Sequence, residues 1–196
     1  MEFKIEKTVV YGLNKSIIAS GNAMRTTMQD NELEADEKDY KRATNLGTTN
    51  VGEGHDNWLN GVLVQFDIYA PLYMWKQLQR YHFLDFISSQ STMHRLAKFD
   101  VKSQCVDDVD QTILNRYQEL LDEYNNGNKD LWRTLVASLP NGFVLGATMT
   151  TNYRQLKTIY NQRKHHKLKE WHEFCRWCET LPNFKELCLK EGIKNE

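Results

Sequence analysis

Two short segments that alternate like β-strands lie far apart in this chain, and most of the sequence between and after them has helical spacing. The first segment, 62–69, places Val62, Val64 and Phe66 on one side of an extended chain, which is typical of a strand with one buried face. A second short strand is predicted over 143–151. Because the strands are few and helices separate them, we expect an α+β fold that is mainly helical.

Five helices are predicted from apolar spacing and from residues that start or stop helices. Pro71 opens the first, because its fixed φ suits the first helical turn. Asn152 would cap a later helix. The predicted ranges are 71–82, 107–125, 129–138 and 152–164, with a last helix that includes 171–178. We assign no structure to 9–27, interpret the charge-rich segment 32–42 as a solvated helix or loop, and interpret the glycine-rich passage 45–61 as a loop suited to ligand contacts.

Composition places the chain among ordinary globular proteins. A length of 196 residues fits one domain, 1–196, and a hydrophobic fraction of 40% is enough for a core. Lysine and arginine number 25 and aspartate and glutamate 26, for a formal net charge of -1. That balance argues against a polycation that works along DNA, so we do not expect a nucleic acid partner. No apolar run approaches the roughly 18 residues that span a bilayer.

The cysteines and the N-terminus favour a cytoplasmic protein. The charged first residues lack the apolar centre of a secretory signal. Four cysteines are too few for a disulfide scaffold in a chain of this size. Cys175 and Cys178 have the spacing of a zinc half-site or a redox pair, with His172 on the same helical face. No second half-site is evident and the pair lies mid-helix. We therefore interpret these residues as packed thiols and expect no metal; a metal site is the alternative.

Phosphate-binding chemistry, if present, must come from arginines and helix starts. The chain has no glycine-rich phosphate loop of the lysine type and no Gly-x-Gly-x-x-Gly fingerprint. Three clusters could meet a phosphate instead. They are Gly-His-Asp-Asn at 54–57, Gln-Leu-Gln-Arg-Tyr-His at 77–82, and Asn-Tyr-Arg-Gln-Leu at 152–156 followed by Arg163.

In this order and spacing, the clusters resemble the flavin-dependent thymidylate synthase family over roughly 45–182. The Gly-His pair at 54–55 is similar to the family's Gly-His before its first core strand. Ala-Pro at 70–71, followed by Gln77 and Arg80, resembles the family's Ala-Pro, Gln and Arg-His-Arg series. Leu-Pro at 139–140, Asn-x-Arg-x-Leu at 152–156 and Arg163 form the most specific block. The resemblance implies a mainly helical α+β fold with a small antiparallel sheet.

The resemblance also implies roles for individual residues. Arg163 matches the catalytic arginine that holds the pyrimidine and polarises it for reaction. The implied flavin contacts are His55, Asn57, Arg80, Tyr81, His82, Asn152, Arg154 and Thr158. The implied nucleotide contacts are Gln77, Ser91, Arg95 and Arg163.

The implied reaction is the conversion of dUMP to dTMP with FAD as the cofactor. Methylenetetrahydrofolate would supply the carbon and NADPH the reducing power. The implied assembly is a homotetramer whose active sites form between subunits, with a pyrimidine deoxynucleotide as its small-molecule partner.

The sequence departs from the family pattern mainly where the nucleotide phosphate would bind. The Arg-His-Arg signature reads Arg80-Tyr81-His82. Met93 stands for a phosphate-binding arginine when Ser91 is aligned with the nucleotide-binding serine, and Val136 stands for a second arginine. Each lost charge-assisted hydrogen bond is worth about 1.5–3 kcal/mol. Possible replacements are Arg95, Lys98 and Arg133.

These departures leave three hypotheses open. The first is an active flavin-dependent thymidylate synthase. The second is a divergent member that modifies or binds another pyrimidine nucleotide. The third is a binding protein for nucleotide or nucleic acid that uses the basic residues from 154 to 169, which the balanced charge argues against.

Overall fold

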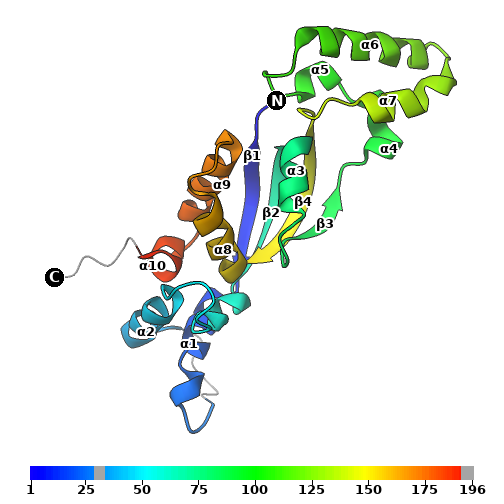
Figure 1. Cartoon of the computed structure of the whole chain (residues 1–196). Coiled ribbons are helices and arrows are strands. Elements are labelled where there is room, and N and C mark those ends of the chain that lie inside the picture. Colours follow the sequence, from blue (N-terminus) through cyan, green and yellow to red (C-terminus); the bar gives the residue numbers. More distant parts are fainter. Residues whose placement is uncertain (29–33, 191–196) are drawn as a thin grey trace. The chain divides into compact units, whose positions relative to one another are not determined.

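A four-stranded antiparallel sheet and a larger set of helices make up the chain (Figure 1). The computed structural model describes residues 1–28 and 34–190. The strands are β1 (Lys4–Tyr11), β2 (Leu63–Pro71), β3 (Asp85–Ser89) and β4 (Val144–Asn152), in the order β1-β2-β4-β3. The prediction of a mainly helical α+β fold with a small antiparallel sheet is confirmed.

Helices account for most of the remaining structure. The longer ones are α1 (Leu13–Ala19), α2 (Glu37–Gly47), α3 (Leu72–Leu78), α6 (Gln111–Asn125), α7 (Trp132–Ser138), α8 (Tyr153–Arg163) and α9 (Lys169–Thr180). The shorter ones are η1 (Asn22–Met24), η2 (Asn57–Gly61), α4 (Thr92–Arg95), η3 (Leu96–Lys98), α5 (Val101–Gln104), η4 (Lys129–Leu131) and α10 (Phe184–Cys188). In the part of the chain that is described, no helix is long and apolar enough to cross a membrane.

The central strands follow the predicted alternation. Val64, Phe66 and Ile68 on β2 are almost fully buried, and the residues between them are partly exposed. The edge strands β1 and β3 were not predicted. Every residue of β3 is exposed, and β1 has no regular alternation of buried and exposed residues. Neither strand therefore carries the period of two that identifies a half-buried strand.

Local signals set several helix boundaries. Asn152 caps α8 as predicted, and its Oδ1 accepts a hydrogen bond from the Gln155 N–H at 2.9 Å. Asp110 caps α6 in the same way, so the helix predicted from residue 107 begins at residue 111. The helix predicted over 71–82 ends earlier, at Leu78. The segment 32–42 was interpreted as a solvated helix or loop, and helix α2 occupies residues 37–42 of it. Residues 32 and 33 lie outside the described part. Helix α2 then extends to residue 47, inside the predicted loop 45–61.

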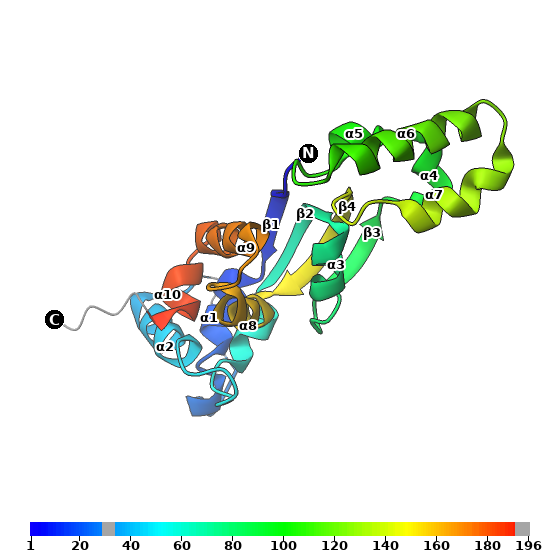
Figure 2. The same ribbon diagram turned by 45° about the horizontal axis from the view of Figure 1, so that its top comes forward.

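The chain divides into two compact units. The first comprises 1–6, 67–80 and 86–148, and the second comprises the described parts of 7–66, 81–85 and 149–196. In the first unit, α6 packs against α5 and α7 (Figure 2). Its core includes Leu114, Leu121 and Leu135, and the Tyr117 hydroxyl donates to the Leu135 carbonyl at 3.1 Å.

Aromatic side chains fill much of the core of the second unit. Trp171 and Phe174 of α9 pack with a ring separation of 5.5 Å, and Tyr153 of α8 meets Phe184 of α10 at 5.1 Å. Helix α10 also lies directly against the end of α2. A Cβ atom at Gly47 would meet the Leu187 carbonyl oxygen at 2.1 Å, so only glycine fits there. This packing holds the loop after α2 close to α8 and α10.

Candidate functional site

Helix α8 and the loop before η2 bring together several of the predicted flavin contacts. His55 and Asn57 are exposed on either side of Asp56, which is only 1% exposed. The Asp56 carboxylate accepts from Arg154 Nε at 3.0 Å and from Lys157 Nζ at 2.7 Å. The loop that carries the predicted His55 and Asn57 is therefore fixed to the helix that carries the predicted Arg154.

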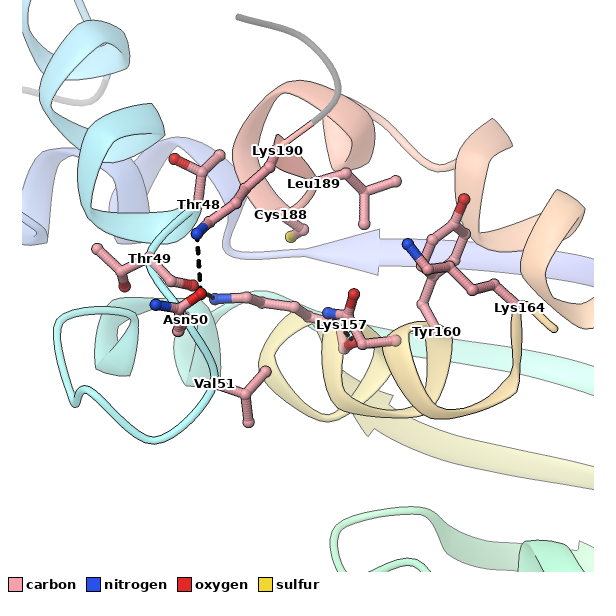
Figure 3. A pocket seen from close by; sticks show the side chains of 11 residues that line it. Thr48, Thr49, Asn50, Val51, Lys157, Tyr160, Lys164, Cys188, Leu189 and Lys190 are labelled. Atoms are coloured by element: carbon pink, nitrogen blue, oxygen red, sulfur yellow. Dashed lines mark hydrogen bonds between the residues drawn. The ribbon is translucent and has the colours of Figure 1, made fainter.

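Lys157 is the buried cation of this arrangement. Its side chain is 2% exposed, and the ammonium group also donates to the carbonyls of Gly47 at 2.8 Å and Thr49 at 2.7 Å. An ammonium group has three N–H donors, and these three acceptors use all of them. Figure 3 shows the Lys157 side chain running from α8 toward Thr49. We call Asp56 and Lys157, with Arg154, the carboxylate clamp.

Asp56 was predicted only as a member of the 54–57 cluster, and Lys157 was not predicted as a site residue. A usable signal was present, because Lys157 shares one side of α8 with Tyr153, Leu156 and Tyr160, all of which are buried. A lysine on an apolar helical face needs a partner, since an unpaired buried charge is costly. The identity of that partner, 101 residues earlier, has no local signature.

The predicted flavin contacts on α8 differ in how much of each side chain remains for a ligand. Arg154 is 34% exposed and uses Nε for Asp56, so its two terminal nitrogens carry four further N–H donors. Thr158 is half-buried and donates to the Arg154 carbonyl at 3.1 Å. Asn152 is buried, and its Oδ1 is occupied by the helix cap described above. Arg154 is thus the strongest anion-binding group among the three.

The predicted catalytic residue, Arg163, lies against two aromatic rings at the end of α8. Its Nε donates to the Tyr81 hydroxyl at 2.6 Å, and its guanidinium carbon lies 4.7 Å from the Trp171 ring centroid and 5.5 Å from that of Tyr81. The Tyr81 hydroxyl donates in turn to Gln162 Oε1 at 3.1 Å. A cation placed against aromatic faces is stabilised there and fixed in orientation. The structure thus brings Arg163 together with Tyr81, a predicted flavin contact.

His166 borders this arginine. Its Nδ1 accepts the Leu168 N–H at 3.1 Å, and its ring lies 6.2 Å from that of Trp171. Burial lowers the pKa of His166 below its ordinary 6.5, and the positive charges of Arg163, His172 and Lys167 lower it further. The imidazole is therefore neutral at pH 7, which leaves Arg163 as the fixed charge beside it.

The predicted nucleotide contacts other than Arg163 belong to the first compact unit. Gln77 is half-buried on α3. Arg80, a predicted flavin contact, is exposed two residues after that helix in the same unit. Ser91 caps α4, where its hydroxyl accepts the His94 N–H at 3.2 Å. Arg95 is exposed at the end of α4. His82 lies with Tyr81 in the segment 81–85 of the second unit and is exposed.

The structure shows what surrounds two residues, Val136 and Met93, that depart from the family pattern. Val136 packs against the apolar core of the first unit, so this position fills space between helices. Met93 is 50% exposed on α4, next to the Ser91 cap. The possible replacements Lys98 and Arg133 are both exposed in the same unit.

The four cysteines are free and buried. Burial raises the pKa of Cys175 to about 11, and it raises the pKa of Cys178 well above its ordinary value. Such thiols are largely protonated at neutral pH and react slowly. Among the described residues, no group of three or more His, Cys, Asp or Glu side chains could hold a metal ion.

Removing one member of the carboxylate clamp is expected to destabilise the protein strongly. Asp56→Asn or Lys157→Met alone leaves a buried charge without its main partner, at a cost of about 3 kcal/mol in the free energy of unfolding. The double variant should cost less than the sum of the two by about 1 kcal/mol or more. Urea denaturation of all four proteins measures the coupling.

An exposed ion pair provides the control for that cycle. Arg116 and Glu119 are paired at 2.8 Å with side chains 60% and 63% exposed, so Glu119→Gln should cost less than about 1 kcal/mol. Strictly additive effects of Asp56→Asn and Lys157→Met would show that the clamp does not operate as a unit.

The His166 titration is expected to report the charge of Arg163. Arg163→Ala removes one cause of the lowered pKa, so the pKa should rise toward 6.5, whereas burial keeps it from recovering fully. The pKa of His166 is lower in the folded protein than in the unfolded chain. Neutral His166 therefore contributes fully to the free energy of unfolding above pH 6.5. That contribution decreases as the pH falls from 6.5 toward the folded pKa. NMR of the imidazole Cε1–H measures the titration. Arg176→Ala, on the exposed side of α9, is the matched control, and an equal shift in both variants would contradict the assignment.

Comparison with known proteins identifies the fold. No family model matches the chain, and no curated protein matches it. The flavin-dependent thymidylate synthase ThyX from Helicobacter pylori, solved with FAD and dUMP, is similar with a TM-score of 0.73 and 17% identity, over 99% of this chain and 100% of that one. A second structure of thymidylate synthase X from Helicobacter pylori with FAD and dUMP gives a TM-score of 0.72 at 17% identity, with 100% of both chains covered.

A third solved structure, the UMP/dUMP methylase PolB from Streptomyces cacaoi bound with 5-Br dUMP, has a TM-score of 0.65 and 16% identity, over 95% of this chain and 92% of that one. The resemblance inferred from three short motifs is thus confirmed at the level of the fold, although the sequences have diverged widely. The chain has the fold of the flavin-dependent thymidylate synthases.

Proposed function

We propose that this protein is a flavin-dependent enzyme that methylates the fifth carbon of a pyrimidine nucleotide, with dUMP converted to dTMP. Two findings support the proposal. The fold matches, over the whole chain, that of a thymidylate synthase solved with FAD and dUMP. The family's most specific motif, Asn-x-Arg-x-Leu followed by an arginine, falls on the start and end of α8.

The single observation that carries the proposal is the fixed position of Arg163. Methylation at the fifth carbon requires the pyrimidine to become electron-rich there, and negative charge then develops on a ring carbonyl. A cation already oriented toward that oxygen stabilises the charge without reorganising in the reaction. Trp171 and Tyr81 hold the guanidinium in one orientation, and the Nε bond to Tyr81 leaves its terminal nitrogens as donors for the carbonyl.

The chemistry of the available donors fits FAD. The proposed contacts His55, Asn57 and Arg154 offer imidazole, amide and guanidinium groups around one loop and one helix, and Arg80 offers a second guanidinium. The carboxylate beside them, Asp56, is neutralised by Lys157 and does not repel a diphosphate. Bound flavin would supply hydride for reduction of the transferred carbon. The remaining proposed contacts are Tyr81, His82, Asn152 and Thr158.

The wider reaction and assembly are part of the same proposal. Methylenetetrahydrofolate is the proposed carbon donor and NADPH the proposed reductant. The proposed nucleotide contacts Gln77, Ser91 and Arg95 belong to one compact unit and Arg163 to the other. The proposed assembly is a homotetramer with shared active sites, as the family resemblance implies. We further propose that 1–196 is one catalytic domain that works in the cytoplasm, a setting that suits free thiols.

A second candidate function is the modification or binding of another pyrimidine nucleotide. It is favoured by the region around α4, where the Ser91 hydroxyl is used as a helix cap and Met93 takes the place of an arginine. Val136 packs in a core, which removes a second phosphate-binding charge. A nucleotide that presents its phosphate differently would tolerate these changes.

Arg163→Ala should reduce turnover by about a hundredfold or more, because it removes the group that stabilises developing charge. The measurement is nucleotide-dependent oxidation of pre-reduced flavin in the purified holoprotein, followed at the flavin absorption band. The control, Arg176→Ala, removes a different arginine of the second unit, one that is exposed, and should retain turnover. Wild-type turnover in Arg163→Ala would remove Arg163 from its catalytic role.

Calorimetric titration with dUMP, UMP and dCMP separates the two candidate functions. We expect dUMP to bind most tightly if the protein is a thymidylate synthase. A competitor that binds at least tenfold more tightly than dUMP would establish the divergent function instead. Failure of the protein to retain FAD, together with no binding of any of the three nucleotides, would contradict both.

A further inference from the structure

A cleft of about 340 Å³ lies in the second unit, beside α8 (Figure 3). Three segments form its walls: residues 48–51 after α2, the side of α8 that carries Lys157 and Lys164, and residues 188–190 at the end of α10. None of the predicted flavin or nucleotide contacts lines it. The lining of the cleft therefore differs from the proposed contacts, although Lys157 connects it through Asp56 to Arg154.

The cleft carries an excess of positive charge. Its lining residues include Lys157, Lys164 and Lys190, and the described lining contains no aspartate or glutamate. Lys157 is paired with Asp56, a residue outside the lining. Lys190 Nζ donates to the neutral Asn50 Oδ1 at 2.8 Å, and Lys164 Nζ lies 6.0 Å from the Tyr160 ring centroid. Among the described residues that line the cleft, none supplies an anionic partner for these two ammonium groups.

Apolar groups form much of the remaining surface, beside the neutral polar residues Thr48, Thr49, Asn50 and Asn161. Cys188 and Leu189 are buried, and Val51 lies on the facing loop, as Figure 3 shows. The Tyr160 hydroxyl donates to Glu179 at 2.6 Å, so its contribution to the cleft is its ring. A ligand would therefore meet cations at the rim and carbon and sulfur atoms at the wall.

We propose that this cleft binds a small organic oxyanion, a phosphate or carboxylate attached to a short apolar or planar body. Lys164 and Lys190 would bind the oxyanion, and Val51, Leu189 and the Tyr160 ring would contact the body. The volume is at the lower end of the roughly 300–1,000 Å³ of small-molecule sites, so a dinucleotide such as FAD is too large for it. The Asn50 amide, already bonded to Lys190, holds one ammonium group at the rim.

The test uses calorimetry on the full chain with two probes, phenyl phosphate and benzoate, and with phenol as the neutral comparison. We expect saturable binding of at least one anion, weakened by added salt, and weaker binding of phenol. The double variant Lys164→Gln/Lys190→Gln should lower the affinity for that anion at least tenfold, because it removes two charge-assisted contacts. Neither lysine is part of the core, so the double variant is expected to fold, and circular dichroism verifies this.

Matched variants locate the probe. Lys185→Gln removes an exposed lysine on α10 outside the cleft and should leave the affinity unchanged. Arg163→Ala should also leave it unchanged, which separates this cleft from the proposed nucleotide site. Binding of phenyl phosphate alone, or of benzoate alone, supports the cleft and identifies the anion it prefers. Absence of saturable binding by both anions, equal affinity for phenol, or full affinity in the folded double variant would overturn the proposal.

Discussion

The ion pair between Asp56 and Lys157 connects the segments that carry several of the proposed flavin contacts. Moving two charges out of water costs several kcal/mol per ion, so a buried pair is stable only when its remaining donors and acceptors are satisfied. Here the ammonium group meets a carboxylate and two backbone carbonyls, and the carboxylate also meets Arg154. One interaction therefore fixes the loop of His55 and Asn57, the end of α2 and the middle of α8. The proposed flavin contacts and the wall of the oxyanion cleft both depend on it.

Local patterns were enough to predict the parts of the fold that have local causes. The alternation around Val64 and Phe66 predicted β2, and the capping preference of Asn152 predicted the start of α8. The fold itself was inferred from short motifs and is confirmed by solved structures at 17% identity. The edge strands escaped prediction because β3 has no buried residue and β1 no regular alternation. Such strands are defined by their neighbours in the sheet, and a single sequence does not record those neighbours.

The sequence allowed us to predict which residues belong to the candidate site, but not the contacts between them. Motif comparison selected Arg163 and Tyr81, but their hydrogen bond joins residues 82 positions apart. It could not find Lys157, whose partner lies 101 positions away. Motif comparison also gave no reason for a valine at position 136. The structure supplies one, because Val136 packs against a helical core. The assigned roles of these residues remain predictions, whereas the contacts that orient them are now defined.

The clamp also limits how this sequence can change over time. Losing Lys157 first would leave a carboxylate buried beside a single arginine, and losing Asp56 first would leave a buried ammonium group with only carbonyls. Each single substitution gives a destabilised protein, so we expect the two positions to change together. A relative that carries an apolar residue in place of Lys157 is expected to carry a neutral one in place of Asp56. Correlated substitution across lineages would then reveal a contact that no motif in one sequence records.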